Sequence, residues 1–496
     1  MESRFAGMRR GLVFASLISL IAAACATSTP SPAPSAAESQ AAASAAAPSQ
    51  VAITPAPINN DQPGPNGGKV IRWFIGLGTG GKPDQIAAEV KVADDFNASQ
   101  KEIYLSVEIY DNRVASNQLQ IEIAAGNPPD IIGPVGVEGL NIFRSQVLDL
   151  SSLVASQKYD MSKIDPKLVE FWKMGEGGAM IGLPFATYPS FMYYNKKLFD
   201  EADLPYPPTK VGEQYQGKPW DMAAVRELGM KLTVDKNGND ATSSKFDPKS
   251  VTQWGFDAQW ADNNPVAEST IFGAFSVVAD DGKTAQIPDP LKTGLNWYSD
   301  GVWKDHFIPT YAQIHSDLLG PDNEFSSGNL AMAETHSWYM CCINPAAPAK
   351  RDFVWGVAVA PSYNGTTTAK LHADTFSLLK TTKHPEEAFK ALTVLVNSDA
   401  LLADYGAFPA DPSKQDAFFA TINKQYPDVK IDWSVPQAML SYPDIPNHQA
   451  YMPDYAKAKK ALQALGNAYR TNELDINAEL TKLQTTLQGI FDAAPE

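Results

Sequence analysis

The chain has 496 residues, of which 44% are hydrophobic and 19% are charged, so it can bury a large core and form more than one domain. Its formal net charge is −16 at pH 7, and so acidic a chain lacks the basic face that nucleic-acid binding requires. Three cysteines are too few for a disulfide scaffold, so a hydrophobic core must hold the fold together.

The N-terminus has the pattern of an export signal. Three arginines precede an apolar run that is too short to span a bilayer and is typical of a secretory signal peptide. The run ends in the letters AAAC, which resemble the bacterial lipobox, although Ala22 stands where leucine is usual. We therefore expect residues 1–24 to be a signal peptide and Cys25 to be acylated, with ordinary cleavage after a small residue as the alternative.

Residues 25–66 are rich in alanine, serine and proline and contain few large apolar side chains. Such a segment cannot bury enough surface to order itself, so we expect a disordered tether. Together with an acylated Cys25, it would anchor the exported protein to the outer face of the cell membrane.

The folded part of the chain opens with alternating strand-like and helix-like segments. The pattern predicts strands over 69–75, 103–110 and 129–135, and helices over 83–99 and 117–126. Strands that alternate with helices in this way form a parallel sheet covered by helices. The body therefore begins as an α/β lobe.

A glycine-rich segment, GLGTGGK over residues 76–82, follows the first predicted strand and has the form of a phosphate-binding loop. Pro83 follows it where a P-loop needs serine or threonine, and proline also removes an N–H from the helix start. Glu108 and Asp111 lie too far along the chain for the acidic residue of a dinucleotide site. Two interpretations remain: a ligand-contacting loop at the carboxyl end of a strand, or a plain strand-to-helix turn.

Beyond residue 182 an aromatic, proline-punctuated strand and a short helix lead into longer loops and a second α/β pattern. The segment DKNGND at 235–240 lacks the glycine and glutamate of an EF-hand, so we interpret it as a turn and predict neither a metal site nor a cofactor. The chain ends in two predicted helices, the last with an apolar stripe of Leu480, Leu483, Leu487, Ile490 and Phe491.

Taken in order, these segments resemble the extracellular solute-binding proteins of bacterial ABC importers, in the carbohydrate group similar to maltose-binding protein. The most specific stretches are GLPFATYPSFMYYNKKLFDEADLP (182–205) and AAGNPPDII (124–132), and the weaker ones include FSSGNLAMAETHSW (325–338) and KTTKHPEEAFKALTVLV (380–396). The resemblance covers most of residues 67–496.

The resemblance implies an α/β, two-lobed periplasmic-binding-protein-like (type II) fold with a hinge and an interlobe cleft. The first lobe would comprise residues 67–187 and 374–425, and the second lobe residues 188–373 and 426–496. The chain would cross between lobes near residues 186–190, 371–374 and 425.

Sugars have apolar C–H faces ringed by hydroxyls, so their sites combine aromatic platforms with planar polar groups. By resemblance and position, the candidate ligand-binding residues are Trp338, Tyr188, Trp260, Tyr451, Asp374, Glu138, Thr79 and Gly80. Asp374 stands where relatives often have glycine, and its carboxylate could accept two solute hydroxyls or satisfy a hinge amide. We predict no catalytic residue.

Cys341 and Cys342 are adjacent and lie just after Trp338. In an exported protein they could form a strained vicinal disulfide or remain two buried thiols.

The predicted function is capture of a mono- or oligosaccharide by lobe closure, without enzymatic turnover. The monomeric receptor would deliver its solute to membrane permease subunits supplied by other chains. No ATPase motif is present, so the energy for transport would come from elsewhere. The alternatives are an exported carbohydrate-active hydrolase and an importer receptor for a non-sugar solute such as a polyol or a glycerol phosphate.

Overall fold

The computed structural model describes residues 60–81, 85–173, 178–259, 264–320, 323–341, 343, 352–405, 407–449 and 452–494, all within one compact unit, Gln50–Glu496. The predicted signal peptide and the tether up to residue 59 lie outside the described residues. Residues 60–66, which composition assigned to the tether, contact the folded body. Asn60 Nδ2 donates to Asp130 Oδ2 at 2.9 Å, and Asn66 Nδ2 donates to the carbonyl oxygen of Ile103 at 2.9 Å.

Within the described residues, nine strands form one mixed sheet in the order β2-β1-β3-β13-β4-β9-β8-β7, with β10 paired to β4. These strands are β1 (Lys69–Ile75), β2 (Ile103–Ile109), β3 (Ile131–Gly136), β4 (Leu183–Asn195), β7 (Val234–Asp235), β8 (Val251–Asp257), β9 (Leu330–His336), β10 (Trp355–Ala358) and β13 (Leu371–Leu378). Two small hairpins pair β5 (Gln214–Tyr215) with β6 (Lys218–Pro219), and β11 (Ser362–Tyr363) with β12 (Thr366–Thr367).

The first three strands form the predicted parallel arrangement. β1 pairs in parallel with β2, from Lys69 opposite Ile103 to Ile75 opposite Ile109, and β3 pairs in parallel with the other edge of β1. Six of the seven residues of β1 are buried, as expected for a strand covered by helices on both faces. This edge of the sheet belongs to the first lobe.

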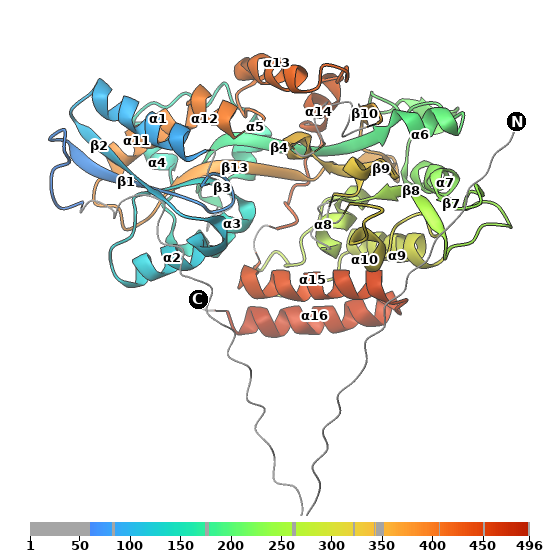
Figure 1. Cartoon of the computed structure of the whole chain (residues 1–496). Coiled ribbons are helices and arrows are strands. Elements are labelled where there is room, and N and C mark those ends of the chain that lie inside the picture. The colour runs from blue at the N-terminus through green and yellow to red at the C-terminus, as the bar shows by residue number, and fades with distance from the viewer. Residues whose placement is uncertain are drawn as a thin grey trace, which may run out of the picture. The chain divides into compact units, whose positions relative to one another are not determined.

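The strand β4 connects the two lobes (Figure 1). Its first half, Leu183–Pro189, pairs with β13, and its second half, Ser190–Tyr194, pairs with β9. Tyr188 still belongs to the hydrophobic core of the first lobe, whereas Phe191 already belongs to that of the second. The chain changes core again between Ala369 and Leu371, and once more between Ala410 and Ile422.

Helices cover both faces of the sheet in the first lobe. One buried cluster lies beneath α1 and α11, and a second lies beneath α2 and α3 on the opposite face and also includes Leu168 and Phe171 of α5. The helices of this lobe are α1 (Ile86–Ser99), α2 (Asn112–Ala124), α3 (Val137–Ile142), α4 (Ser151–Ser156), α5 (Pro166–Phe171), α11 (Pro385–Val396) and α12 (Asp399–Asp404).

The second lobe surrounds β8, β9 and β10 with the remaining helices and one large core. They are α6 (Lys196–Glu201), α7 (Met222–Leu232), α8 (Pro265–Ser269), α9 (Asp289–Trp303), α10 (Tyr311–Ile314), α13 (Gln415–Gln425), α14 (Ser434–Met439), α15 (Tyr455–Thr471) and α16 (Ile476–Asp492), with the short 3-10 helix η5 (Ser337–Cys341) after β9. Among the described residues, no helix is both long enough and apolar enough to cross a bilayer.

Candidate functional site

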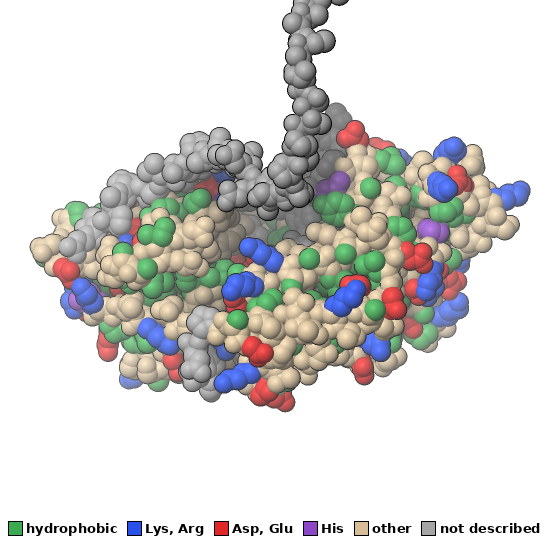
Figure 2. Space-filling model, turned by 90° about the horizontal axis from the view of Figure 1, so that it is seen from below, with side chains coloured by type: hydrophobic (Ala, Val, Ile, Leu, Met, Phe, Trp, Pro, Cys, Tyr) green, Lys and Arg blue, Asp and Glu red, His purple; other side chains and the backbone are tan. Residues whose placement is uncertain are grey.

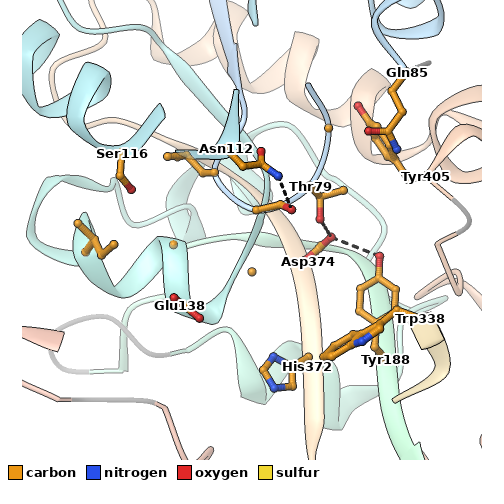
Figure 3. A pocket seen from close by; sticks show the side chains of 16 residues that line it. Thr79, Gln85, Asn112, Ser116, Glu138, Tyr188, Trp338, His372, Asp374 and Tyr405 are labelled. Carbon is orange, nitrogen blue, oxygen red and sulfur yellow. Dashed lines mark hydrogen bonds between the residues drawn. The ribbon is translucent and has the colours of Figure 1, made fainter. Parts of the chain in front are cut away.

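A cavity of about 640 Å³ lies where the two lobes meet. Its walls come from the loop after β1, the start of α2, the β3–α3 junction, β4, β13 and η5 (Figure 3). The lining residues are Leu77, Gly78, Thr79, Gly80, Gln85, Asn112, Ser116, Gly136, Glu138, Gly139, Ile142, Tyr188, Trp338, His372, Asp374 and Tyr405. No lysine or arginine is among these described lining residues.

Asp374 lies on β13 in the middle of this wall and is 6% exposed. Its Oδ2 accepts a hydrogen bond from Thr79 Oγ1 at 2.7 Å and a longer one from the Tyr188 hydroxyl at 3.3 Å (Figure 3). Among the described residues, no donor bonds to Oδ1. Burial raises the pKa of Asp374 to about 6, and the two hydrogen bonds oppose that rise. At neutral pH it is therefore a buried carboxylate that can accept further hydrogen bonds from a ligand.

The glycine loop after β1 forms part of the same wall. Gly78 and Gly80 have φ angles of 124° and 82°, which favour glycine. The N–H of Gly81 donates to Glu89 Oε1 at 2.9 Å, so a buried carboxylate already occupies a donor that a phosphate would need. This geometry opposes phosphate binding, and Thr79 instead ties the loop to β13 through Asp374.

Trp338, in η5, supplies the largest aromatic surface of the wall. The Tyr188 ring meets its indole edge to face at 5.5 Å, and the His372 ring does so at 4.9 Å. Trp338 is half-buried and packs against both the first-lobe and the second-lobe cores. It therefore lies at the junction of the lobes, where a bound ligand would touch both.

Glu138, on α3, lines the cavity and also forms an ion pair with Lys459 of α15, with Oε1 and Nζ 2.6 Å apart. Three residues further on, Asn141 Nδ2 donates to the carbonyl oxygen of Gln449. The two contacts connect α3 of the first lobe to residues of the second. One carboxylate oxygen of Glu138 is thus already paired with a lysine.

Six of the eight candidate ligand-binding residues line this one cavity: Trp338, Tyr188, Asp374, Glu138, Thr79 and Gly80. Their contact with a solute stays a prediction. Trp260 and Tyr451 lie outside the described residues, as do Cys25, Cys342 and the side chain of Cys341.

The sequence did not indicate several other residues of the wall. Asn112 and Ser116 lie at the start of α2, after the carboxyl end of β2, a place where open α/β sheets bind ligands. That rule could have identified Asn112 and Ser116 as candidates from the sequence. Gln85 and Tyr405 carry no such signal, because only the packing of distant segments brings them together.

The family assignment rests on the sequence together with this architecture. The sequence model of the family described as bacterial extracellular solute-binding protein matches residues 79–401. The chain belongs to this family. The solute-binding protein is accordingly an exported one, and its cavity lies where two lobes joined by β4 meet. No curated protein matches the sequence.

Solved structures share the fold of this solute-binding protein. The M. tuberculosis protein UspC is 18% identical, with a TM-score of 0.64 over 85% of this chain and 100% of that one. Lmo0181 from Listeria monocytogenes, in complex with cycloalternan, is 18% identical, with a TM-score of 0.61 over 85% of this chain and 97% of that one. MalE from Bdellovibrio bacteriovorus, bound to maltotriose, is 17% identical, with a TM-score of 0.56 over 85% of this chain and 99% of that one.

Proposed function

We propose that the protein captures a neutral carbohydrate between its lobes and delivers it, unaltered, to the permease of an ABC importer. The cavity carries this proposal, because it combines the Trp338 platform with the buried carboxylate of Asp374 at the junction of the lobes. An aromatic face suits the C–H face of a sugar ring, and a carboxylate accepts hydrogen bonds from its hydroxyls. Structural neighbours bound to cycloalternan, maltotriose and tagatose support the same class of solute.

The charge of the wall favours a neutral solute. Asp374 and Glu138 line the cavity, and its described lining residues include no lysine or arginine. Glu138 is paired with Lys459, but among the described residues the buried Asp374 carboxylate is held by two hydroxyls only, so a glycerol phosphate or an acidic sugar would meet its negative charge there. We therefore place a neutral mono- or oligosaccharide ahead of an anionic solute, and a polyol remains a less specific alternative.

Capture would proceed by closure of the lobes about the crossing strands. β4 and the segment that leads into β13 connect the lobes, so a solute that contacts Asp374 on one side and Trp338 on the other favours the closed state. The lobe boundaries proposed from the sequence are 67–187 with 374–425, and 188–373 with 426–496, whereas Tyr188 packs in the first-lobe core and Ile422 of α13 in the second-lobe core. An acylated Cys25 and the tether would hold this monomeric receptor at the membrane.

The decisive experiment is thermal unfolding of residues 60–496 against neutral mono- and oligosaccharides, polyols, glycerol phosphates, amino acids and peptides. A solute at about 100 times its dissociation constant stabilises the fold by roughly 2.7 kcal/mol, which is a measurable rise in melting temperature. Chromatography of the solute after incubation separates a receptor from a hydrolase. A neutral sugar recovered unchanged supports the proposal, a cleaved one supports the hydrolase, and a phosphate hit contradicts the neutral-solute assignment.

The surface charge provides a secondary argument about partners. On the face shown in Figure 2, lysines and arginines are mixed with aspartates and glutamates and do not gather into one basic patch. Together with the net charge of −16, this arrangement disfavours nucleic acid as a partner.

A further inference from the structure

Three histidine rings lie next to one another at the end of the cavity that holds Trp338. His336 ends β9, His372 is on β13, and His448 is on the segment between α14 and α15. The ring centroids of His336 and His372 are 4.5 Å apart, and those of His372 and His448 are 5.3 Å apart. His372 lines the cavity (Figure 3), whereas the other two are buried behind it. Binding of a sugar in the cavity does not by itself require the two buried rings.

His336 supports the platform directly. Its ring stacks on the Trp338 indole with a centroid distance of 4.0 Å and an angle of 16° between the rings. One face of the indole is therefore covered, while His372 and Tyr188 meet it edge to face. The remaining surface of the Trp338 side chain lines the cavity. The orientation of Trp338 thus depends on a ring that the solute does not reach.

The supporting ring is held by stacking, because neither nitrogen of His336 has a hydrogen-bond partner among the described residues. Burial, followed by the nearby His372, Lys370 and His448, lowers the pKa of His336 well below its ordinary value. Burial and the charges of His448, Lys370 and Lys459 lower the pKa of His372 in the same direction. Both rings are therefore neutral at pH 7.

The charged groups around the cluster do not offset a proton on it. From β9, the Glu334 carboxylate is paired with Lys370 Nζ at 2.6 Å, and both are 1% exposed. From the segment before α15, the Asp444 carboxylate lies 2.6 Å from His448 Nδ1. The other titratable groups that face the cluster are Lys459 from α15, Tyr188 from β4 and Asp374 from β13. An added charge on His336 would thus lie near Lys370, and the carboxylates of Glu334 and Asp444 are already bonded to other groups.

We propose that His336 is a positioning residue: its neutral ring holds Trp338 at the cavity wall, and protonation of His336 at acid pH loosens this platform and releases the solute. This inference rests on the proposed function only in naming a solute. The loosening itself is a property of the empty protein, so it can be measured without one.

The first arm of the test needs no ligand. Tryptophan emission of residues 60–496 is recorded as pH falls from 8 to well below the ordinary histidine value of about 6.5, because the pKa of His336 is lowered well below that value. We expect a step in the wild type that is absent from W338F, which assigns it to Trp338, and absent from H336F and H336N, whose side chains cannot take a proton. H315F is the matched control, because exposed His315 also stacks on an aromatic ring, that of Tyr311 at 4.1 Å, but outside the cavity wall. It should keep the step.

A second control separates the histidines from Asp374, whose pKa of about 6 lies in the same range. D374N removes that titration, so the step should persist in this variant. A step that disappears in D374N and persists in both H336F and H336N would overturn the proposal. Two uncharged replacements are used because either could fold poorly, and circular dichroism identifies such a variant.

The second arm uses the carbohydrate found in the unfolding panel. We expect H336A, which removes the support, to bind it roughly fivefold to tenfold more weakly at pH 7.5, and H336F to restore most of the affinity and to hold it to lower pH than the wild type. Unchanged affinity in H336A together with an unchanged acid profile in H336F would overturn the inference. If no carbohydrate binds the wild type, the proposed function fails and the emission arm alone decides this inference.

Discussion

At the scale of single residues, Trp338 provides the sharpest test of the cavity. Replacing it by alanine removes the aromatic platform, and we expect solute affinity to fall by at least tenfold, or about 1.5–3 kcal/mol. W338F should retain part of the affinity, because a smaller ring still covers the sugar face. Isothermal titration calorimetry measures both. W433F is the control, since Trp433 stacks on Phe419 at 4.3 Å and is not part of the cavity wall; equal losses in W433F and W338A would contradict the assignment.

Asp374 makes a second prediction, on stability and pH. Its pKa is about 6 in the folded protein and 3.8 in the unfolded chain, so the folded state binds more protons between these values. Ionisation therefore costs folded-state stability as pH rises from about 4 through 6. The unliganded D374N variant, whose amide oxygen can still accept from Thr79 and Tyr188, should be more stable than the wild type at pH 8, by up to about 3 kcal/mol.

The advantage of D374N should shrink to a small fraction near pH 4, because Asp374 is then protonated in the folded chain and close to half protonated in the unfolded chain. Thermal unfolding at pH 4, 6 and 8 measures the difference between variant and wild type at each pH. That difference isolates Asp374 from the histidines, which act with the opposite sign: their lowered pKa values reduce stability as pH falls below about 6.5. A constant difference across the three pH values would show that Asp374 is not buried as described.

At the scale of elements, α3 and α15 are joined beside the cavity by Glu138 and Lys459. The pair is partly exposed, so it is worth no more than about 1 kcal/mol. K459M should therefore open the unliganded lobes and weaken solute binding by up to about fivefold. Small-angle X-ray scattering detects the opening as a larger radius of gyration. K457M is the matched control, because Lys457 on the same helix forms its ion pair with nearby Asp454. This variant should change neither the radius of gyration nor the solute affinity.

The sequence predicted the local elements well because their signals are local. β1 was expected over 69–75 and occupies Lys69–Ile75, and the last apolar stripe, from Leu480 to Phe491, is buried on α16 with Ile490 partly exposed. The cavity is a different case, since its walls meet through long-range pairing. Asp374 and Trp338 were found through family resemblance, whereas the stacking of His336 on Trp338 and the pairing of Glu138 with Lys459 follow no sequence spacing.

At the scale of the whole molecule, β13 occupies a central place in the first lobe. It lies between β3 and β4, although its residues 371–378 follow the first part of the second lobe in the chain, from α6 to β10. A fragment of residues 60–369 therefore contains β1, β2 and β3 but lacks the strand that joins them to β4. We expect this fragment to show no cooperative urea transition by circular dichroism, whereas residues 60–496 should show one. A cooperative first-lobe transition in the fragment would show that β13 is dispensable.

The same placement of β13 bears on how the newly made chain reaches its destination. Domains usually fold from the N-terminus as the ribosome releases them, but this leading lobe must wait for a strand encoded some three hundred residues after β1. Long-range pairing of this kind is also slow once all of its parts are present. A polypeptide that must be threaded across a membrane before it folds gains time from this delay. The topology that joins the two lobes is thus also expected to delay the folding of an exported chain.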